Sequence, residues 1–310
     1  MTKFSSLLLA IFFFSACTNN KKSDTVSTEN NNPNPDALHA LSKSEDSPLI
    51  KKIKQLIVKR KFAEALNLVE TNLEKSKEKN QLLYLGGVAA FNQKKLAKAK
   101  KMFKQALDNG ADFVDLYVNY SETLFYLKKF KLAEKKVREG LKKYPDNPAL
   151  WYNLGGIYME QGKKKDAFSY YGKSLMVDGS YAPSIIAVGS IYYQDKKTSQ
   201  AVSYFKKLLS IKGFKLEGHL RLAYIYMHLQ DWEKAVKHIK KTLKMDPNNI
   251  RAAQFLKVAL KYQDLSFILE LAAQGKCKEA LKKKTEFSQK HNPSEKIIKK
   301  IKKTLKKHCK

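Results

Sequence analysis

The residues that could carry chemistry are few and scattered along the chain. None of the six histidines stands in the HExxH or CxxC spacing that gathers metal ligands. The segment YGKS, residues 171–174, has the lysine and serine that end a phosphate-binding loop, but Ala167 replaces the upstream glycine. A helical period also runs through this segment, and a helix interior offers no cradle of amides for a phosphate. The sequence therefore predicts no enzymatic activity, no metal and no cofactor.

The first of the three cysteines follows a short apolar stretch. Leu7 to Phe14 is an unbroken apolar run, preceded by one positive charge, Lys3, and followed by two small residues. A bilayer-crossing helix needs about 20 apolar residues, so this order indicates a secretory signal peptide. The stretch resembles the lipobox of bacterial lipoproteins, although Phe14 stands where a smaller aliphatic residue is usual. The resemblance implies that residues 1–16 are removed and that Cys17 is acylated. The alternative is a simple secretion signal that is cut nearby.

Residues 17–45 are rich in Asn, Ser, Thr, Asp and Pro and contain no aromatic residue. Such a segment cannot bury enough apolar surface to offset the entropy of ordering it, so we expect a disordered tether. In lipoproteins of bacteria with two membranes, a residue other than Asp after the acylated cysteine implies export to the outer membrane. Thr18 occupies that position. The protein is therefore expected to be an exported lipoprotein that is anchored on the periplasmic side of an outer membrane.

Apolar residues recur at helical spacing, interrupted by short turns, over residues 46–249. The units repeat every 34 residues and start at Asp46, Asn80, Val114, Pro148, Ala182 and Leu216. The twentieth residue of every unit is alanine: Ala65, Ala99, Ala133, Ala167, Ala201 and Ala235. The eighth residue is small in five units: Gly87, Ser121, Gly155, Gly189 and Ala223. Each unit is therefore predicted to be two amphipathic helices around a tight turn, with small residues where the helices touch.

This pattern resembles the tetratricopeptide repeat (TPR) family. The unit from Pro148 carries the family's residues most fully: Trp151, Leu154, Gly155, Tyr158, Ala167 and Tyr171. The resemblance implies an all-α fold, a right-handed α-solenoid of six to seven helix pairs. One pair cannot bury its own apolar face, so neighbouring units must stack.

Residues 250–310 are expected to hold a divergent seventh unit and capping helices. A seventh first helix is predicted over residues 250–263, and the phase then slips, because Ala280 lies eleven residues later than the period requires. Asn292 as N-cap and Pro293 at the first position predict the start of the last helix.

The last two cysteines lie symmetrically about Pro293, since position 293 is midway between 277 and 309. An antiparallel hairpin that turns there would bring Cys277 and Cys309 together. With Cys17 acylated, these two remain in an oxidising compartment, so the sequence predicts a disulfide between them. The alternative is two unpaired cysteines.

The formal net charge of +31 invites a nucleic-acid function. Only four of the 60 basic residues are arginine, although the guanidinium fork suits phosphate best, and an exported protein rarely meets nucleic acid. We therefore expect no nucleic-acid partner. The charge still creates a field that attracts acidic partners or anionic lipid.

In the TPR family, ligands usually lie in a concave groove at positions 2, 5, 9, 12 and 13 of each unit. Between residues 80 and 249 none of these twenty-five positions is Lys or Arg, although that span holds thirty of them. The positions that we expect to bind a protein segment are aromatic or Met: Tyr84, Phe91, Phe125, Tyr126, Tyr152, Met159, Tyr193, Tyr224 and Met227. Such side chains supply contact area at small entropic cost. The alternative is that a tightly wound solenoid buries them as core.

Two functions remain open. The first is a lipid-anchored scaffold that binds a protein segment in this groove and assists assembly of an envelope complex. Its architecture resembles that of the TPR lipoproteins that help type IV pili assemble. The second is a protein whose lysine-rich exterior docks on peptidoglycan, lipopolysaccharide or anionic lipid. Docking through exposed charge should be lost at about 1 M salt, where screening acts within about 3 Å.

Overall fold

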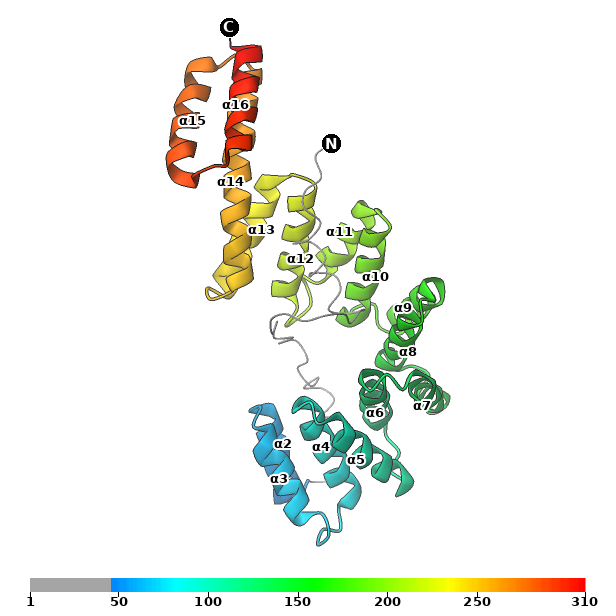
Figure 1. Cartoon of the computed structure of the whole chain (residues 1–310). Helices are drawn as coiled ribbons and strands as arrows, with labels where there is room; N and C mark the ends of the chain where they lie inside the picture. Colours follow the sequence, from blue (N-terminus) through cyan, green and yellow to red (C-terminus); the bar gives the residue numbers. More distant parts are fainter. Residues whose placement is uncertain (1–45, 310) are drawn as a thin grey trace. The chain divides into compact units, whose positions relative to one another are not determined.

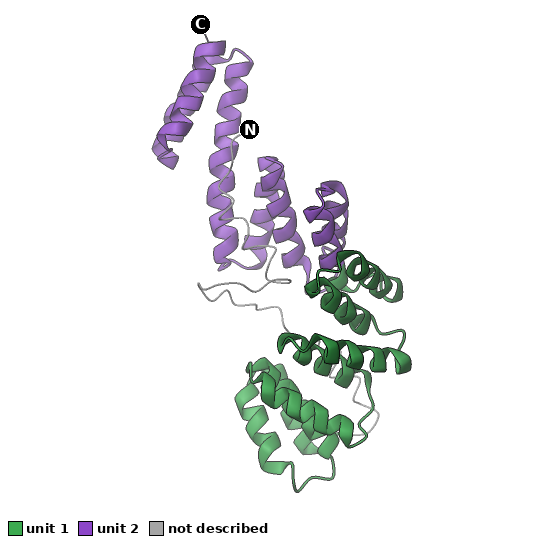
Figure 2. Cartoon of the chain, turned by 45° about the vertical axis from the view of Figure 1, so that its right-hand side comes forward, with its two compact units in different colours: residues 1–184 green, residues 185–310 purple. Residues whose placement is uncertain are grey.

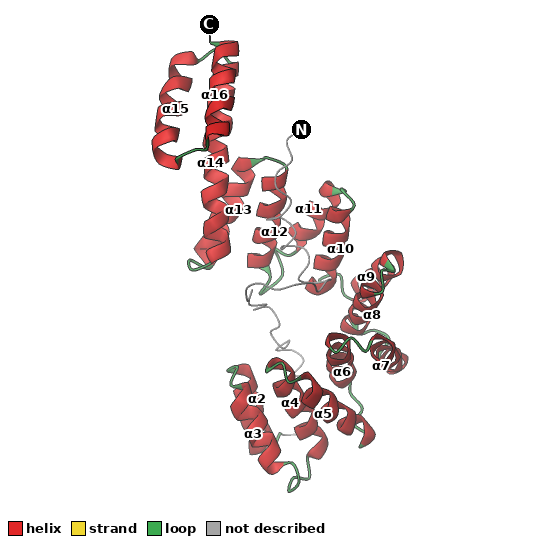
Figure 3. Cartoon of the chain, viewed as in Figure 1, coloured by secondary structure: helices red, strands yellow, loops and turns green. Residues whose placement is uncertain are grey.

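The computed structural model describes residues 46–309, which form fifteen α-helices and contain no β-strand (Figures 1 and 3). The predicted all-α repeat fold is therefore confirmed. The signal peptide (residues 1–16), Cys17 and the tether (residues 17–45) lie outside the described residues and stay predictions. Within residues 46–309, no helix combines the length and apolar character needed to cross a membrane.

The chain divides into two compact units, residues 1–184 and 185–310 (Figure 2), and each is described separately. The first unit contains four helix pairs in its described part. Their helices are α2 (Pro48–Val58), α3 (Phe62–Asn72), α4 (Lys79–Asn92), α5 (Leu96–Asp108), α6 (Val114–Tyr126), α7 (Phe130–Lys143), α8 (Pro148–Glu160) and α9 (Lys164–Val177). The next helix, α10 (Ala182–Gln194), begins at the end of this unit. The even-numbered helices are the first helices of the repeats.

The turn inside each pair has one conformation in all six repeats. The fifteenth residue of each repeat has a positive φ, between 57° and 75°. These residues are Arg60, Lys94, Lys128, Gly162, Lys196 and Gln230. The next residue's N–H donates to the carbonyl five residues back, as in Lys95 N–H to Ala90 O at 2.9 Å. This bond satisfies a carbonyl at the C-terminus of the first helix and defines a Schellman motif. Only Gly162 is a glycine, so the turn sequence itself did not reveal the repeat.

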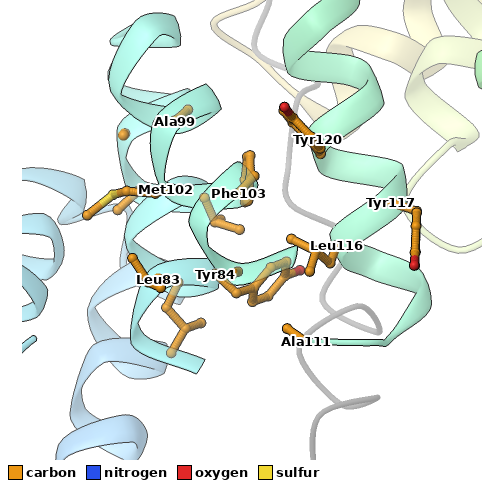
Figure 4. Packing of buried hydrophobic residues seen from close by; sticks show 14 of the residues in the cluster. Leu83, Tyr84, Ala99, Met102, Phe103, Ala111, Leu116, Tyr117 and Tyr120 are labelled. Carbon is orange, nitrogen blue, oxygen red and sulfur yellow. The ribbon is translucent and has the colours of Figure 1, made fainter. Parts of the chain in front are cut away.

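The small residues lie where the paired helices meet, as the sequence predicted. All six alanines at position 20 are fully buried. At position 8, a Cβ atom on Gly155 would lie 2.6 Å from the ring of Tyr171, and one on Gly189 would lie 2.7 Å from Phe205. Figure 4 shows the corresponding contact region of α4 and α5, with Phe103 and Tyr84 in the core. The missing side chain of the first helix thus makes room for a ring from the second.

The second unit continues the same arrangement. After α10 it contains α11 (Thr198–Lys207), α12 (Lys215–His228), α13 (Trp232–Met245), α14 (Ile250–Ala273), α15 (Cys277–His291) and α16 (Glu295–His308). Asn249 caps α14 by accepting a hydrogen bond from the Ala252 N–H at 2.9 Å. Such a cap satisfies one of the amides that a helix N-terminus leaves without a partner.

Helix α14 does not end at residue 263 as predicted but runs on to Ala273. Its turn is at Gly275, with φ 75°, and Lys276 N–H donates to Leu271 O at 2.9 Å. This is the repeat's usual turn, displaced by eleven residues, which is about three helical turns. Ala280, five residues after the turn, is fully buried like the other position-20 alanines. The apparent phase slip is therefore a lengthened first helix, which is followed by the usual pairing.

The last three helices share one core. Leu265, Ile268 and Leu271 of α14 pack with Ala280 and Phe287 of α15 and with Ile301 and Leu305 of α16. The apolar face of α16 is thus covered within the protein, and its lysines face outward. This arrangement agrees with the capping role predicted for these helices.

The chain reverses between α15 and α16, but not as predicted. Asn292 does not cap α16; it ends α15 with φ 39°, and Ser294 precedes α16. Asn tolerates the left-handed conformation better than most residues and often ends helices in this way. Cys277 and Cys309 are 32 positions apart in the sequence, and their Cα atoms lie 5.5 Å apart, which is the placement of a disulfide pair.

Candidate protein-interaction site

Aromatic and acidic side chains project from the first helices of the first unit, and we call these residues the first-helix face. It comprises Phe91 of α4, Asp115, Glu122, Phe125 and Tyr126 of α6, and Tyr152, Met159 and Glu160 of α8. Tyr126 is 47% exposed, and the others are half-buried. The prediction that they bind a protein segment is not tested by the structure and stays a prediction.

Tyr84 does not belong to this face, although the sequence predicted it there. Its side chain is 1% exposed. Its ring meets Phe113 edge-on at 4.9 Å and lies 6.0 Å from Phe103 (Figure 4). Its hydroxyl accepts a hydrogen bond from Asn119 Nδ2 at 2.9 Å. Tyr84 is therefore core, and its prediction as a binding residue is wrong.

One aromatic cluster joins α4 to α6. The rings of Phe91 and Tyr126 are 5.6 Å apart, and Phe125 contacts Tyr126 at 5.7 Å and Phe130 at 5.6 Å. Gly156 of α8 faces this cluster, because a Cβ atom there would lie 4.0 Å from Phe125. The helix surface beside Phe125 therefore has no side chain, which leaves the cluster accessible along that edge.

A second aromatic cluster lies on α8 and α9 near Glu122 of α6. Tyr152 of α8 packs on Tyr171 at 5.5 Å and on Tyr181 at 5.9 Å. Burial, followed by Tyr152 and the charge of Glu122, raises the pKa of Tyr181. Burial raises the pKa of Glu122 itself to about 7. This carboxyl group is thus half protonated near neutral pH and would gain from a cation at its side.

Two further carboxylates on the first-helix face form no ion pair. Burial raises the pKa of Asp115 to about 6, and one of its oxygens, Oδ2, is buried without a hydrogen-bond partner. Burial also raises the pKa of Glu160, although the charge of Lys128 opposes this shift. Among the described residues, none of Asp115, Glu122 and Glu160 has an ion pair. In a chain with 60 basic residues, this face therefore keeps three carboxylates without a salt bridge.

The second unit has its own cluster on α10, α12 and α14. Tyr193 lies 5.9 Å from Tyr224 and 6.0 Å from His228, and Tyr224 lies 4.6 Å from His228. Met227 packs beside them against the core of α12 and α13. Tyr193, Tyr224 and Met227 are half-buried, and His228 is exposed. The acidic residue here, Glu217, is already paired with Arg221 at 2.6 Å, so this cluster differs in charge from that of the first unit.

Sequence reasoning missed Tyr181 because it lies in the turn before α10, at position 34 of its unit. Phe113 holds the same position two repeats earlier. It packs on Tyr84 as Tyr181 packs on Tyr152. In both repeats an aromatic residue at position 34 accompanies a tyrosine at position 5. This recurrence in the sequence could have revealed Tyr181 as part of the site.

No catalytic or metal-binding geometry accompanies these clusters. Within residues 46–309, no three His, Cys, Asp or Glu side chains gather as metal ligands would. The YGKS segment lies inside α9, where the Ser174 hydroxyl donates to the Pro148 carbonyl at 2.8 Å. Its serine therefore holds two helices together.

Three models of the tetratricopeptide repeat match the chain, over residues 121–183, 182–214 and 216–249. They fall on the last four of the six repeats, residues 121–249. The chain belongs to the tetratricopeptide repeat family. TPR folds are typically non-catalytic scaffolds for protein interaction, so a scaffold is the general role that the fold supports.

Two solved TPR structures cover most of the chain. PilW, a type IV pilus biogenesis factor, is 18% identical with a TM-score of 0.56, and the match covers 67% of this chain and 96% of PilW. PilF of Pseudomonas aeruginosa is 16% identical with a TM-score of 0.53, covering 71% of this chain and 96% of PilF. At such identities the likeness shows a shared TPR fold.

Two larger proteins match only in part. The Cut9 and Hcn1 assembly of the APC/C has a TM-score of 0.57 at 16% identity, covering 68% of this chain but 42% of the other. Protein O-mannosyl-transferase TMTC3 of Mus musculus is 28% identical over 81 residues, which are 26% of this chain and 9% of that protein. The chain spans less than half the length of either, and the mannosyltransferase likeness is confined to those 81 residues.

Proposed function

We propose that this TPR protein is a non-enzymatic, lipid-anchored scaffold whose first-helix face in the first unit binds a segment of another protein. Residues 1–16 would be removed, Cys17 acylated, and residues 17–45 would tether the repeats to the periplasmic side of an outer membrane. The pair Cys277 and Cys309 would be oxidised there. The anchor and its location rest on the lipobox resemblance alone.

The observation that carries the proposal is the combination of accessible aromatic rings with unpaired carboxylates on a face without lysine. Phe125, Tyr126 and Tyr152 offer apolar contact. Glu122, whose charge acts on Tyr181, has a pKa of about 7. A Lys or Arg side chain of a partner would restore the charge of Glu122 and could also stack on Tyr152. The partner is therefore a segment with apolar anchors and at least one basic residue.

Assembly of an envelope complex is the context that we propose for this binding. PilW is described as a type IV pilus biogenesis factor, and it shares the TPR fold with this chain. A role in pilus assembly would require that this face recognise a pilus or pore component.

The test is capture of partners by crosslinking in the bacterial envelope, followed by purification of the lipidated protein. The variant Tyr126→Ala/Tyr152→Ala should lose partner capture by tenfold or more while its helical circular dichroism is unchanged. Met176→Ala is the control, because Met176 is 86% exposed on α9, away from the face. Equal capture by the double variant and the control would refute the proposal.

The second candidate, docking through exposed lysines, has one observation in its favour. Residues 277–309 carry twelve lysines against three acidic residues, a net charge of +9. Capture that persists at about 1 M salt, where screening acts within about 3 Å, would identify the first-helix face as the binding surface. Capture that disappears there would favour the lysines.

A further inference from the structure

A cavity of about 280 Å³ opens between the second helices α5 and α7 of the first unit. Its walls include Lys100, Lys104 and Leu107 of α5, Tyr120 of α6, and Leu132 and Lys135 of α7. It is formed by the second helices and by Tyr120, which is position 7 of its repeat. The cavity is therefore distinct from the first-helix face. Its volume is near the lower end of the range for small-molecule sites, about 300 Å³ and above.

The floor and one wall of the cavity are apolar. The Tyr120 side chain is 2% exposed, and its ring lies 6.4 Å from Phe103 in the core (Figure 4). Burial, and then the charges of Asp108 and Glu139, raise the pKa of Tyr120. Its hydroxyl therefore remains a hydrogen-bond donor at neutral pH. Leu132, 37% exposed, and Leu107 complete an apolar surface beside it.

The cations around the cavity are only partly neutralised. Lys104 pairs with Asp108 at 2.5 Å and Lys136 with Glu139 at 2.7 Å. Lys100, Lys129 and Lys135 have no ion pair among the described residues. The close contact with Lys129, followed by its charge, lowers the pKa of Lys100. Two ammonium groups therefore lie close together without an anion between them, at the edge of an apolar hollow.

The cavity has a lysine where the neighbouring second helices have a bulkier apolar or aromatic side chain. Position 23 of the repeat is Met102 on α5, Lys136 on α7 and Tyr170 on α9. Met102 lies beside Gly86 of α4, and Tyr170 stacks on Trp151 of α8. Lys136, in contrast, lines the cavity.

We propose that this cavity binds a phosphate monoester that carries an apolar chain. The phosphate oxygens would accept hydrogen bonds from Lys100, Lys129 and Lys135, and the chain would lie on Leu107, Leu132 and the ring of Tyr120. Ammonium groups on flexible stems suit a phosphate, and each adds a charge-assisted hydrogen bond. The same chemistry belongs to a free alkyl phosphate and to the head of a phosphatidic acid.

The test is calorimetric titration of the purified full-length protein with hexyl phosphate. The variant Lys100→Gln/Lys129→Gln/Lys135→Gln should bind at least tenfold more weakly than the wild type. The control is Lys302→Gln/Lys303→Gln/Lys306→Gln on α16, which removes the same charge elsewhere and should bind within twofold of the wild type. Tyr120→Phe should weaken binding about threefold. Inorganic phosphate has the anionic group without the apolar chain, and hexanol has the chain without the phosphate. Both should bind more weakly than hexyl phosphate.

Absence of hexyl phosphate binding by the wild type, or an equal loss in both triple variants, would overturn the proposal. Vesicles of phosphatidylcholine with and without phosphatidic acid then distinguish the source of the phosphate. Loss of sedimentation with acidic vesicles in the cavity variant alone supports a lipid headgroup. Unchanged sedimentation, together with lost hexyl phosphate binding, supports a free phosphate ester.

Discussion

A Cβ atom placed on Gly87 would lie 2.4 Å from Cε1 of Phe103. Gly87, on α4, is position 8 of its repeat, and Phe103, on α5, is position 24. Gly155 and Tyr171 form the same contact two repeats later. The separation is far below ordinary contact, and Phe103 is fully buried, so its ring has no free space into which it can move.

Gly87→Ala should therefore lower the free energy of unfolding by about 1–3 kcal/mol, the usual result of overpacking a core. Gly172→Ala is the matched control, because Gly172 is also helical and has no atom within 4 Å of its Cβ position. That control should raise the free energy by about 0.5–1 kcal/mol through backbone entropy. Urea denaturation measures both changes, and a neutral Gly87→Ala would contradict the packing argument.

Lys94→Gly should stabilise the first unit by up to about 1 kcal/mol. Lys94 has φ 60°, which costs a residue with a side chain about 1–2 kcal/mol, and the added flexibility of glycine offsets part of that gain. Lys101→Gly removes the same charge from the interior of α5 and should instead lose about 1 kcal/mol. Thermal unfolding of both variants provides the comparison, and equal destabilisation would show that the turn is not strained.

Cys277→Ser/Cys309→Ser should selectively loosen the end of the second unit. Closing a loop of 32 positions stabilises a chain by about 3–4 kcal/mol in the chain-entropy model. Hydrogen exchange should therefore quicken in α15 and α16 and remain unchanged in α4 and α5. Unchanged exchange in α16, or identical alkylation masses of the wild type with and without reductant, would show that the bridge does not form.

The stability of the second unit should fall as the pH drops from about 6.5 to about 4. His219 Nδ1 and His238 Nδ1 lie 2.9 Å apart and share one proton between α12 and α13. Burial lowers the pKa of both; His238 reaches about 4, aided by His219, Lys241, Lys237 and Lys206, and Lys241 and Lys215 act on His219. The folded form thus binds fewer protons than the unfolded form in this range, so its stability is full above pH 6.5.

His219 is 8% exposed and His238 is half-buried, so we expect a loss of about 1–2 kcal/mol over that range. His238→Gln keeps a hydrogen-bonding side chain without the titration, so its stability should depend less on pH than that of the wild type. Parallel pH profiles for the two proteins, measured by urea denaturation, would refute the role of the pair.

Affinity for a basic segment should rise as the pH increases through about 7. The pKa of Glu122 is raised to about 7 in the free protein, and only the ionised form attracts a cation, so binding releases a proton. Fluorescence anisotropy with a labelled partner segment measures this dependence. Glu122→Gln should abolish it and weaken binding at pH 8 by roughly tenfold, about the 1.4 kcal/mol of one charge-assisted contact. A pH-independent wild type would exclude Glu122 from recognition.

The 34-residue period and the small residues at positions 8 and 20 could be read from the sequence because they record local packing. Ala99 and Gly87 must be small wherever their repeat lies, since the two helices of one pair always meet there. The lengthened α14 was harder to see. An insertion of eleven residues is about three turns, so it preserves the amphipathic face and hides the missing turn until Gly275.

The structure divides the predicted binding residues between the core and the surface, which the sequence did not do. Tyr84 and Tyr152 both occupy position 5, yet Phe113 and Phe103 enclose Tyr84, whereas Tyr152 stays half-buried beside Glu122. Position in the repeat assigned both side chains to one face but could not distinguish core from surface. That distinction depends on which neighbours the adjacent helices contribute.

By itself, the sequence determined the helix pairs, their turns and the exclusion of lysine from the first-helix positions, because each follows from a period within one or two helices. Only the tertiary structure decided that Tyr84 is core, that the charge of Glu122 acts on Tyr181, and that Lys100 and Lys135 line one cavity. These relationships depend on the side chains that neighbouring helices contribute, which a period within one or two helices does not record.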